Sequence, residues 1–171
     1  MREAPHLPGS LQLALGIAMA RLLLDVPIVA QSRTNTCWHS CSEMIWWYWQ
    51  GVTGRQGPMN TLADHWSANN PVQPADFVVL ARAVGLETLP ATPMLTSETL
   101  AGALKQAGPL WCAGYWYGPG HVVVLTGIEG ENVHINDPDG GVRKVGLLSW
   151  FNTKLAWHVG GCLMRKSANA Y

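Results

Sequence analysis

Cys37 has the strongest case for chemistry, because it stands where a polar loop meets a helical segment. Residues 31–36 are polar and include helix-capping types, whereas residues 38–50 are rich in helix-forming and aromatic side chains. At the amino end of a helix, unpaired N–H groups and the positive end of the macrodipole favour the thiolate, which lowers the pKa of the cysteine. We therefore expect Cys37 to be a nucleophile.

Two polar residues in the second half of the chain occupy the ends of apolar runs. His121 follows a Gly-Pro-Gly turn and opens one run, and Asp137 closes the next run directly before a proline. If residues 129–131 connect these runs as a hairpin, both side chains lie at the same end of neighbouring strands. The carboxylate of Asp137 could then orient the imidazole of His121.

A cysteine protease uses this combination of groups. The imidazole exchanges a proton with the thiol, and a third group fixes the tautomer of the imidazole. The oxyanion of the tetrahedral intermediate also needs hydrogen-bond donors. The backbone N–H of Cys37 and the side-chain amide of Gln31 could supply them.

Several short motifs support this interpretation as a set. Gln31 lies six residues before Cys37 and is preceded by Val26-Pro27, and Trp38 follows Cys37 directly. The second half adds Gly120-His121-Val122-Val123-Val124 and Ile135-Asn136-Asp137-Pro138. Over roughly residues 26–165, the sequence resembles the papain-like cysteine proteases. Its closer resemblance is to their bacterial branch, which includes double-glycine leader peptidases and avirulence-type effector proteases.

The resemblance implies a role for each site residue. It makes Gln31 the oxyanion donor, Cys37 the nucleophile, His121 the general base and acid, and Asp137 the orienting residue. Plant and animal papains use asparagine at the last position, so Asn136 stays an alternative to Asp137. For substrate binding we name three tryptophans, which are Trp38, Trp111 and Trp116.

The resemblance also implies a function and a setting. It indicates a cysteine endopeptidase with a protein substrate, and Gly-Gly is the cut that the resemblance to leader peptidases implies. It further suggests a bacterial effector or toxin that a secretion system delivers into the cytoplasm of a target cell, with a cognate immunity protein as inhibitor. The alternatives are an acyltransferase, transglutaminase or deamidase with the same Cys-His-Asp set, and an inactive binding module.

The other cysteines have simpler explanations. Cys41 lies one helical turn beyond Cys37 and is a competing nucleophile, but Trp38 directly after Cys37 favours Cys37. A zinc site from Cys37, His39 and Cys41 is disfavoured, because His39 would point away from the thiols on a helix and no second close pair completes a tetrahedral set. We expect no metal and no cofactor.

The elements that must position these residues fall into two groups. Helices are expected at Ser10 to about Leu24, Cys37 to Gln50, Asn60 to Ser67 and Pro74 to Val84. A further helix is expected from a cap at Thr96 or Ser97 to the Gly108-Pro109 stop. Short apolar or β-branched runs, separated by glycine-rich turns, predict strands at 110–117, 121–128, 132–136, 142–147 and 158–165. The fold class is thus α+β and papain-like, with a helical half that contains the central catalytic helix packed on an antiparallel sheet half.

Composition narrows the function classes. The 171 residues suit one compact domain, which we divide into an amino-terminal arm and helix (1–25) and a protease domain (26–171). Eleven basic and eleven acidic residues cancel, so no net field attracts nucleic acid or an anionic membrane. No apolar run reaches the roughly 20 residues of a membrane span. Arg21 and Asp25 interrupt the apolar segment near the start, which favours a packed helix over a signal peptide.

Overall fold

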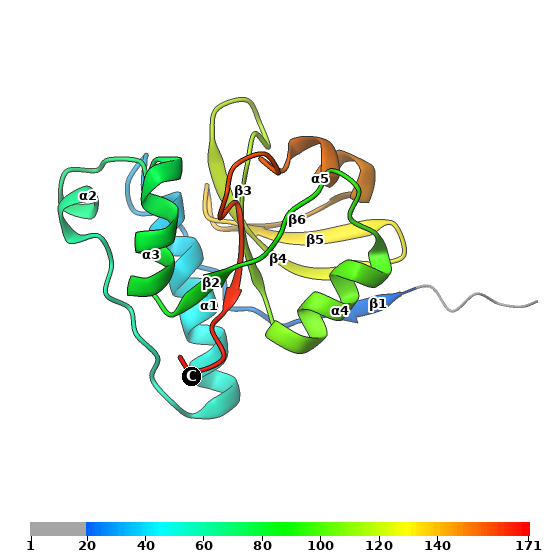
Figure 1. The fold of residues 1–171 in the computed structure, drawn as a ribbon, viewed down its shortest axis with the longest axis horizontal. Helices are drawn as coiled ribbons and strands as arrows, with labels where there is room; N and C mark the ends of the chain where they lie inside the picture. Colours follow the sequence, from blue (N-terminus) through cyan, green and yellow to red (C-terminus); the bar gives the residue numbers. More distant parts are fainter. Residues whose placement is uncertain (1–19) are drawn as a thin grey trace, which may run out of the picture.

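The computed structural model describes residues 20–171, which form helices packed against a twisted antiparallel sheet (Figure 1). This arrangement confirms the predicted α+β class. The helices are α1 (Cys37–Thr53), α2 (Ala63–Ser67), α3 (Phe77–Ala83), α4 (Ser97–Ala107) and α5 (Leu148–Lys154), with a 3-10 turn at Pro74–Asp76. The strands are β1 (Arg21–Leu23), β2 (Leu86–Thr88), β3 (Leu110–Gly114), β4 (His121–Glu129), β5 (Asn132–Asp137), β6 (Val142–Leu147) and β7 (Leu163–Lys166).

The sheet has the strand order β2-β7-β3-β4-β5-β6, and β1 pairs with the far end of β4. All the pairings are antiparallel. Its centre is apolar, because every residue of β3 and residues 122–128 of β4 are buried. Helices α1, α2 and α3 lie on one side in Figure 1, and α4 and α5 flank the sheet half. Strands β3, β4, β5 and β6 are neighbours in the sheet in the same order as in the sequence. Because neighbouring strands are antiparallel, the start of β4 and the end of β5 lie at the same end of the sheet.

Helix α1 is the element that joins the two halves. Trp38, Cys41 and Ile45 recur at helical spacing and are fully buried, and the helix packs on β4 and β3. The helix ends at Gly54, whose φ of 68° requires the left-handed conformation that glycine adopts without strain. The aromatic side chains of α1 are not all buried: Trp47 is 43% exposed, and the last turns extend beyond the sheet (Figure 1).

The sequence missed three elements. The predicted helix from Ser10 to about Leu24 is wrong at its end, where Arg21–Leu23 form β1; the rest of it lies outside the described residues. Strand β2 and helix α5 were not predicted. Few side chains of β1 and β2 are buried, so the apolar and polar residues of these strands do not alternate in a way that predicts a strand. No helix within residues 20–171 has the length and apolar character needed to cross a bilayer.

The helix that precedes β3 agrees closely with prediction. Thr96 caps α4 by accepting a hydrogen bond from the backbone N–H of Thr99, and Gly108 follows its last residue with φ of 67°. Two other helices differ at their starts. The helix expected from Asn60 begins only at Ala63, and the one expected from Pro74 begins as a 3-10 turn and becomes α-helical at Phe77.

Candidate active site

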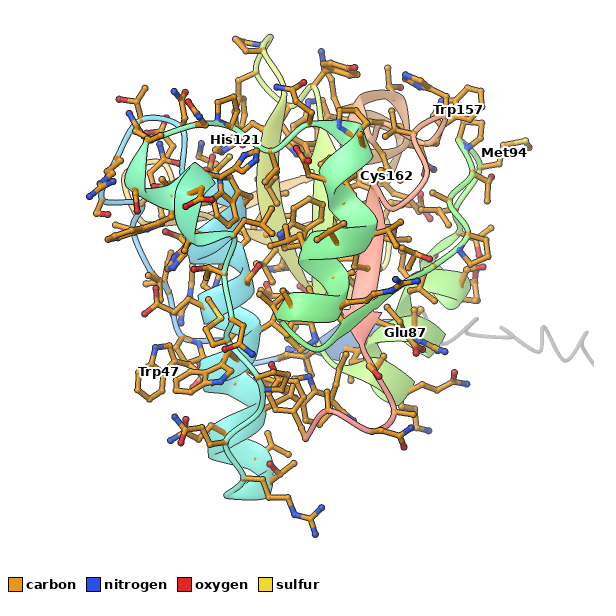
Figure 2. All side chains as sticks on the ribbon, turned by 60° about the vertical axis from the view of Figure 1, so that its left-hand side comes forward. Trp47, Glu87, Met94, His121, Trp157 and Cys162 are labelled. Carbon is orange, nitrogen blue, oxygen red and sulfur yellow. The ribbon has the colours of Figure 1, made fainter. Side chains whose placement is uncertain are left out.

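The site lies where the amino end of α1 meets the start of β4 and the end of β5. Cys37 is the first residue of α1, His121 the first of β4 and Asp137 the last of β5. Figure 2 shows His121 at the end of the sheet that faces the start of α1. The antiparallel pairing of β4 with β5, in which Val124 lies opposite Asn136, brings the predicted histidine and aspartate together.

His121 and Asp137 are in direct polar contact. The Nε2 atom of His121 lies 2.7 Å from Oδ1 of Asp137, which is fully buried. The backbone N–H of Asp139 donates to the same oxygen at 2.9 Å, and Nζ of Lys144 donates to Oδ2 at 2.7 Å. Three donors therefore hold this carboxylate as an anion in one orientation.

The surroundings shift the pKa values of both groups. Burial alone would lower the pKa of His121, but hydrogen bonds with Asp137 and Cys37 and their charges raise it to about 9. Burial would raise the pKa of Asp137, and the hydrogen bonds from His121, Lys144 and the Asp139 backbone lower it to about 2. The pair is accordingly an imidazolium and a carboxylate at neutral pH.

Cys37 lies on the other side of the imidazole. Its side chain is partly exposed, and its hydrogen bond with His121 contributes to the raised pKa of that ring. Because Asp137 occupies Nε2, Nδ1 is the ring nitrogen left for the thiol. This order of groups is the one in which an imidazole can exchange a proton with a thiol and with a leaving group.

Gln31 is held by the loop before α1. Its backbone N–H donates to the carbonyl of Pro138 at 2.8 Å, which ties the loop to the turn after Asp137. Its side-chain Nε2 donates to the carbonyl of Thr34 at 3.1 Å, and its Oε1 is buried without a partner. The predicted oxyanion donor is thus anchored beside the site, with its amide hydrogen-bonded inside its own loop.

Asn136 and Asp137 point to opposite faces of β5, as adjacent strand residues must. The amide of Asn136 donates to the carbonyl of Val26 at 3.1 Å and is buried away from His121. Of the two candidates that the sequence left open, Asp137 is the one that contacts the imidazole.

Cys41 is unsuited to be the nucleophile. It is fully buried, its thiol donates to the carbonyl of Val122 at 3.3 Å, and burial raises its pKa well above the usual value. Burial likewise raises the pKa of Cys112, and it raises that of Cys162 to about 11. Within residues 20–171, no three histidine, cysteine or acidic side chains are grouped so that they could hold a metal ion.

A cleft of about 430 Å³ opens beside Cys37 and His121. Its wall is mostly apolar, and the residues that line it include Trp38, Phe77, Val122, Val159, Asn35 and Gln73. The size and the apolar lining suit an extended peptide segment with an apolar side chain in the cleft.

Only one of the three predicted substrate-binding tryptophans lines this cleft. Trp38 does, and its Nε1 also donates to the carbonyl of Asn70 at 3.2 Å. Trp111 and Trp116 do not line the cleft as expected. Both are buried, and they pack on Phe77 and on Phe151, respectively. Inward positions on and beyond a central strand place large aromatic rings in the core.

The sequence missed Tyr117 and Lys144 as parts of the site. The Tyr117 ring lies 6.3 Å from the His121 ring, and Nζ of Lys144 lies 4.1 Å from the Tyr117 centroid. Trp150 packs against Tyr117, with 6.3 Å between the ring centroids. No sequence signal marked Lys144: its inward position on β6, beside Val145 that is 61% exposed, is visible only in the folded sheet.

Comparisons with known proteins agree with this geometry. Residues 21–156 match the family model described as papain-like cysteine protease AvrRpt2. Among solved structures, the chain is similar to a double glycine motif protease from an AMS/PCAT transporter in complex with the leader peptide. That match has a TM-score of 0.54 and 20% identity, and it covers 84% of this chain and 91% of the other. At this identity the likeness shows the fold alone.

Proposed function

Because the chain belongs to the family of papain-like cysteine proteases described by AvrRpt2, we propose that it hydrolyses peptide bonds with Cys37, His121 and Asp137 as its catalytic triad. The single observation that carries the residue roles is the position of His121. Its imidazole contacts the Asp137 carboxylate through Nε2 and hydrogen-bonds the Cys37 thiol from the same ring. The other cysteines of residues 20–171 are buried, whereas Cys37 is partly exposed.

In the first half of the reaction, the Cys37 thiolate attacks the carbonyl carbon of a peptide bound in the cleft. The carbonyl oxygen becomes an oxyanion, which the backbone N–H of Cys37 and the amide of Gln31 stabilise. For this role, the amide of Gln31 turns from the carbonyl of Thr34 towards the bound substrate. The imidazolium of His121 then gives its Nδ1 proton to the departing amine, and a thioester remains on Cys37.

In the second half, water replaces the amine. Neutral His121 takes a proton from the water molecule, whose oxygen attacks the thioester carbon. The tetrahedral intermediate collapses, the carboxylic acid product leaves, and the thiolate–imidazolium pair is restored. Asp137 stays ionised throughout and keeps Nε2 of the ring occupied, so that Nδ1 faces the reacting atoms.

We propose a substrate with small residues at the cut, with Gly-Gly as the first candidate. The support is the fold shared with a double glycine motif protease, whose crystal structure holds a leader peptide. Peptides that differ only at the cut, with Gly-Gly or Ala-Ala, test this idea: equal kcat/KM for the two would refute it.

We also propose that the protein acts as a bacterial effector inside a target cell after delivery by a secretion system, and that an immunity protein inhibits it. The support is membership of a family described by AvrRpt2. Expression in a recipient cytoplasm should be toxic in the wild type and harmless in Cys37→Ala. An active enzyme that is harmless at high level would contradict this role.

The decisive test of the protease function is N-terminal profiling of a bacterial lysate treated with purified variants. Wild type should create new protein N-termini, and Cys37→Ala should create none while its circular dichroism spectrum is unchanged. Cys41→Ala is the matched control: it removes a thiol one turn away that is buried and bonded to the backbone, so cleavage should persist. Modified glutamine side chains or crosslinks without new N-termini would instead indicate a deamidase or transglutaminase.

A further inference from the structure

Lys144 extends the proposed triad by one more charged group. His121, Asp137 and Lys144 come from the adjacent strands β4, β5 and β6 and form a continuous chain of contacts. Nε2 of His121 lies 2.7 Å from Oδ1 of Asp137, and Nζ of Lys144 donates to Oδ2 at the same distance. The carboxylate is fully buried, so these contacts and the Asp139 backbone N–H replace its hydration.

We propose that Lys144 is a positioning residue of the active site, which fixes the rotation of the Asp137 carboxylate and balances its buried charge so that His121 can release its proton to the leaving amine. This inference rests on the proposed function, because it assigns Lys144 a part in the same proton transfer. Lys144 itself is not among the residues that line the cleft.

The position of Lys144 distinguishes it from an ordinary surface ion pair. Exposed pairs contribute little because both partners remain hydrated. Here the side chain of Asp137 has no exposed surface, whereas that of Lys144 is 39% exposed. The ammonium also lies over the ring of Tyr117, whose other neighbour is His121. Lysine therefore closes the solvent side of the carboxylate and keeps one face of Tyr117 in place.

The strand that carries Lys144 is arranged for this contact. Lys144 lies opposite Ile135 in the β5–β6 register, two residues from Asp137 and on the same face of the sheet. Its neighbour Val145 points outward and is 61% exposed. A strand selected only for packing would direct the valine inward and the lysine outward, so the reversed pattern indicates a role for the ammonium at the buried carboxylate.

Charge balance explains what the ammonium does for the reaction. Four groups determine the charge around the imidazole: Cys37 from α1, Asp137 from β5, Lys144 from β6 and Tyr117 from the β3–β4 connection. In the proposed reaction two anions, the attacking sulfur of Cys37 and the carboxylate of Asp137, face the imidazolium. Without Lys144 the Asp137 carboxylate would lose its ammonium partner, and His121 would hold its proton more strongly. Proton donation to the amine would then be slower.

The test compares Lys144→Met, Lys144→Arg and the control Lys105→Met, which removes the same charge from an exposed position on α4. Two readouts are needed: the pH dependence of Cys37 alkylation by iodoacetamide, and kcat and KM for peptide cleavage. The basic limb of the pH profile is the change in alkylation rate that accompanies loss of the His121 proton. In Lys144→Met, this limb should move up by about half a pH unit or more. Its kcat should fall about tenfold, with KM within about twofold of wild type.

Lys144→Arg keeps the charge and should restore the basic limb to its wild-type position, and Lys105→Met should match wild type throughout. A basic limb that stays in place or moves down in Lys144→Met would overturn the proposal, whatever the loss of activity, because a purely structural defect weakens the contact of His121 with Asp137. Failure of the proposed function looks different: wild-type Cys37 would then show neither fast alkylation nor a basic limb.

Discussion

Replacing Asp137 with asparagine tests the electrostatics of the proposed triad most directly. The substitution keeps the size of the side chain and removes one buried negative charge. It also leaves the ammonium of Lys144 without its carboxylate partner, close to the imidazole. Both effects disfavour the imidazolium, so the pKa of His121 should fall.

The magnitude follows from the shift in the folded protein. The pKa of His121 rises from 6.5 to about 9, which corresponds to about 3 kcal/mol in favour of the imidazolium. Burial lowers the pKa of His121, and Asp137 and Cys37 together more than offset this effect. The hydrogen bond with Asp137 contributes more to the rise in pKa than the hydrogen bond with Cys37. Loss of the carboxylate should therefore lower the pKa by at least about one unit.

The assay is the rate of Cys37 alkylation across pH, together with kcat/KM. In wild type the basic limb should lie near pH 9, where the imidazolium loses its proton. In Asp137→Asn it should lie near or below about pH 8. The matched control is Asp139→Asn, which removes an exposed carboxylate two residues along and keeps the backbone N–H that donates to Asp137. A basic limb near pH 9 in Asp137→Asn would refute the assignment of Asp137 as the partner of His121.

Three further predictions concern stability. The pKa of Asp137 is lowered from 3.8 to about 2 in the folded state, so the unfolded state binds more protons as the pH falls between these values. About 2 kcal/mol of stability, present above about pH 4, should therefore disappear by about pH 2, and urea unfolding of Asp137→Asn should lack this component. Trp111→Ala should cost about 3–5 kcal/mol, seen as a lower urea midpoint, because the fully buried ring packs on Phe77; a cost below about 1 kcal/mol would contradict its core position. Gly108→Ala should cost about 1 kcal/mol or more in thermal unfolding, because φ of 67° strains any side chain and a Cβ there would lie 2.6 Å from the Trp49 ring; an unchanged Tm would contradict this.

The helices and central strands could be predicted because their local patterns are strong. Thr96 and Gly108 bracket α4 with the expected cap and stop, and β4 shows a buried apolar run between two turns. Strands β1 and β2 lacked such signals: each is three residues long, and each pairs with a distant segment on only one side. Their conformation comes from β4 and β7 rather than from their own residues.

The candidate site shows the same division. Cys37, His121 and Asp137 were identified because each stands at the junction of a loop with a strongly patterned element. The choice between Asn136 and Asp137 required the pleat of β5, which sends one side chain to the imidazole and the other to the carbonyl of Val26. Trp111 and Trp116 were expected at the substrate cleft for a similar reason. Which positions of β3 and of the turn after it point into the core is visible only once the sheet is assembled.

The sequence by itself determined the candidate reacting groups, because a thiol, an imidazole and a carboxylate have chemistry that does not depend on their partners, and the motifs around them are local. Only the tertiary structure decided how these groups meet. The β4–β5–β6 register aligns His121, Asp137 and Lys144 on one face of the sheet. Because Asp137 is buried, three protein donors take the place of water around its carboxylate. The role proposed for Lys144 was therefore invisible in sequence: charge balance depends on distance and burial, and residues far apart in the chain acquire both only when the sheet forms.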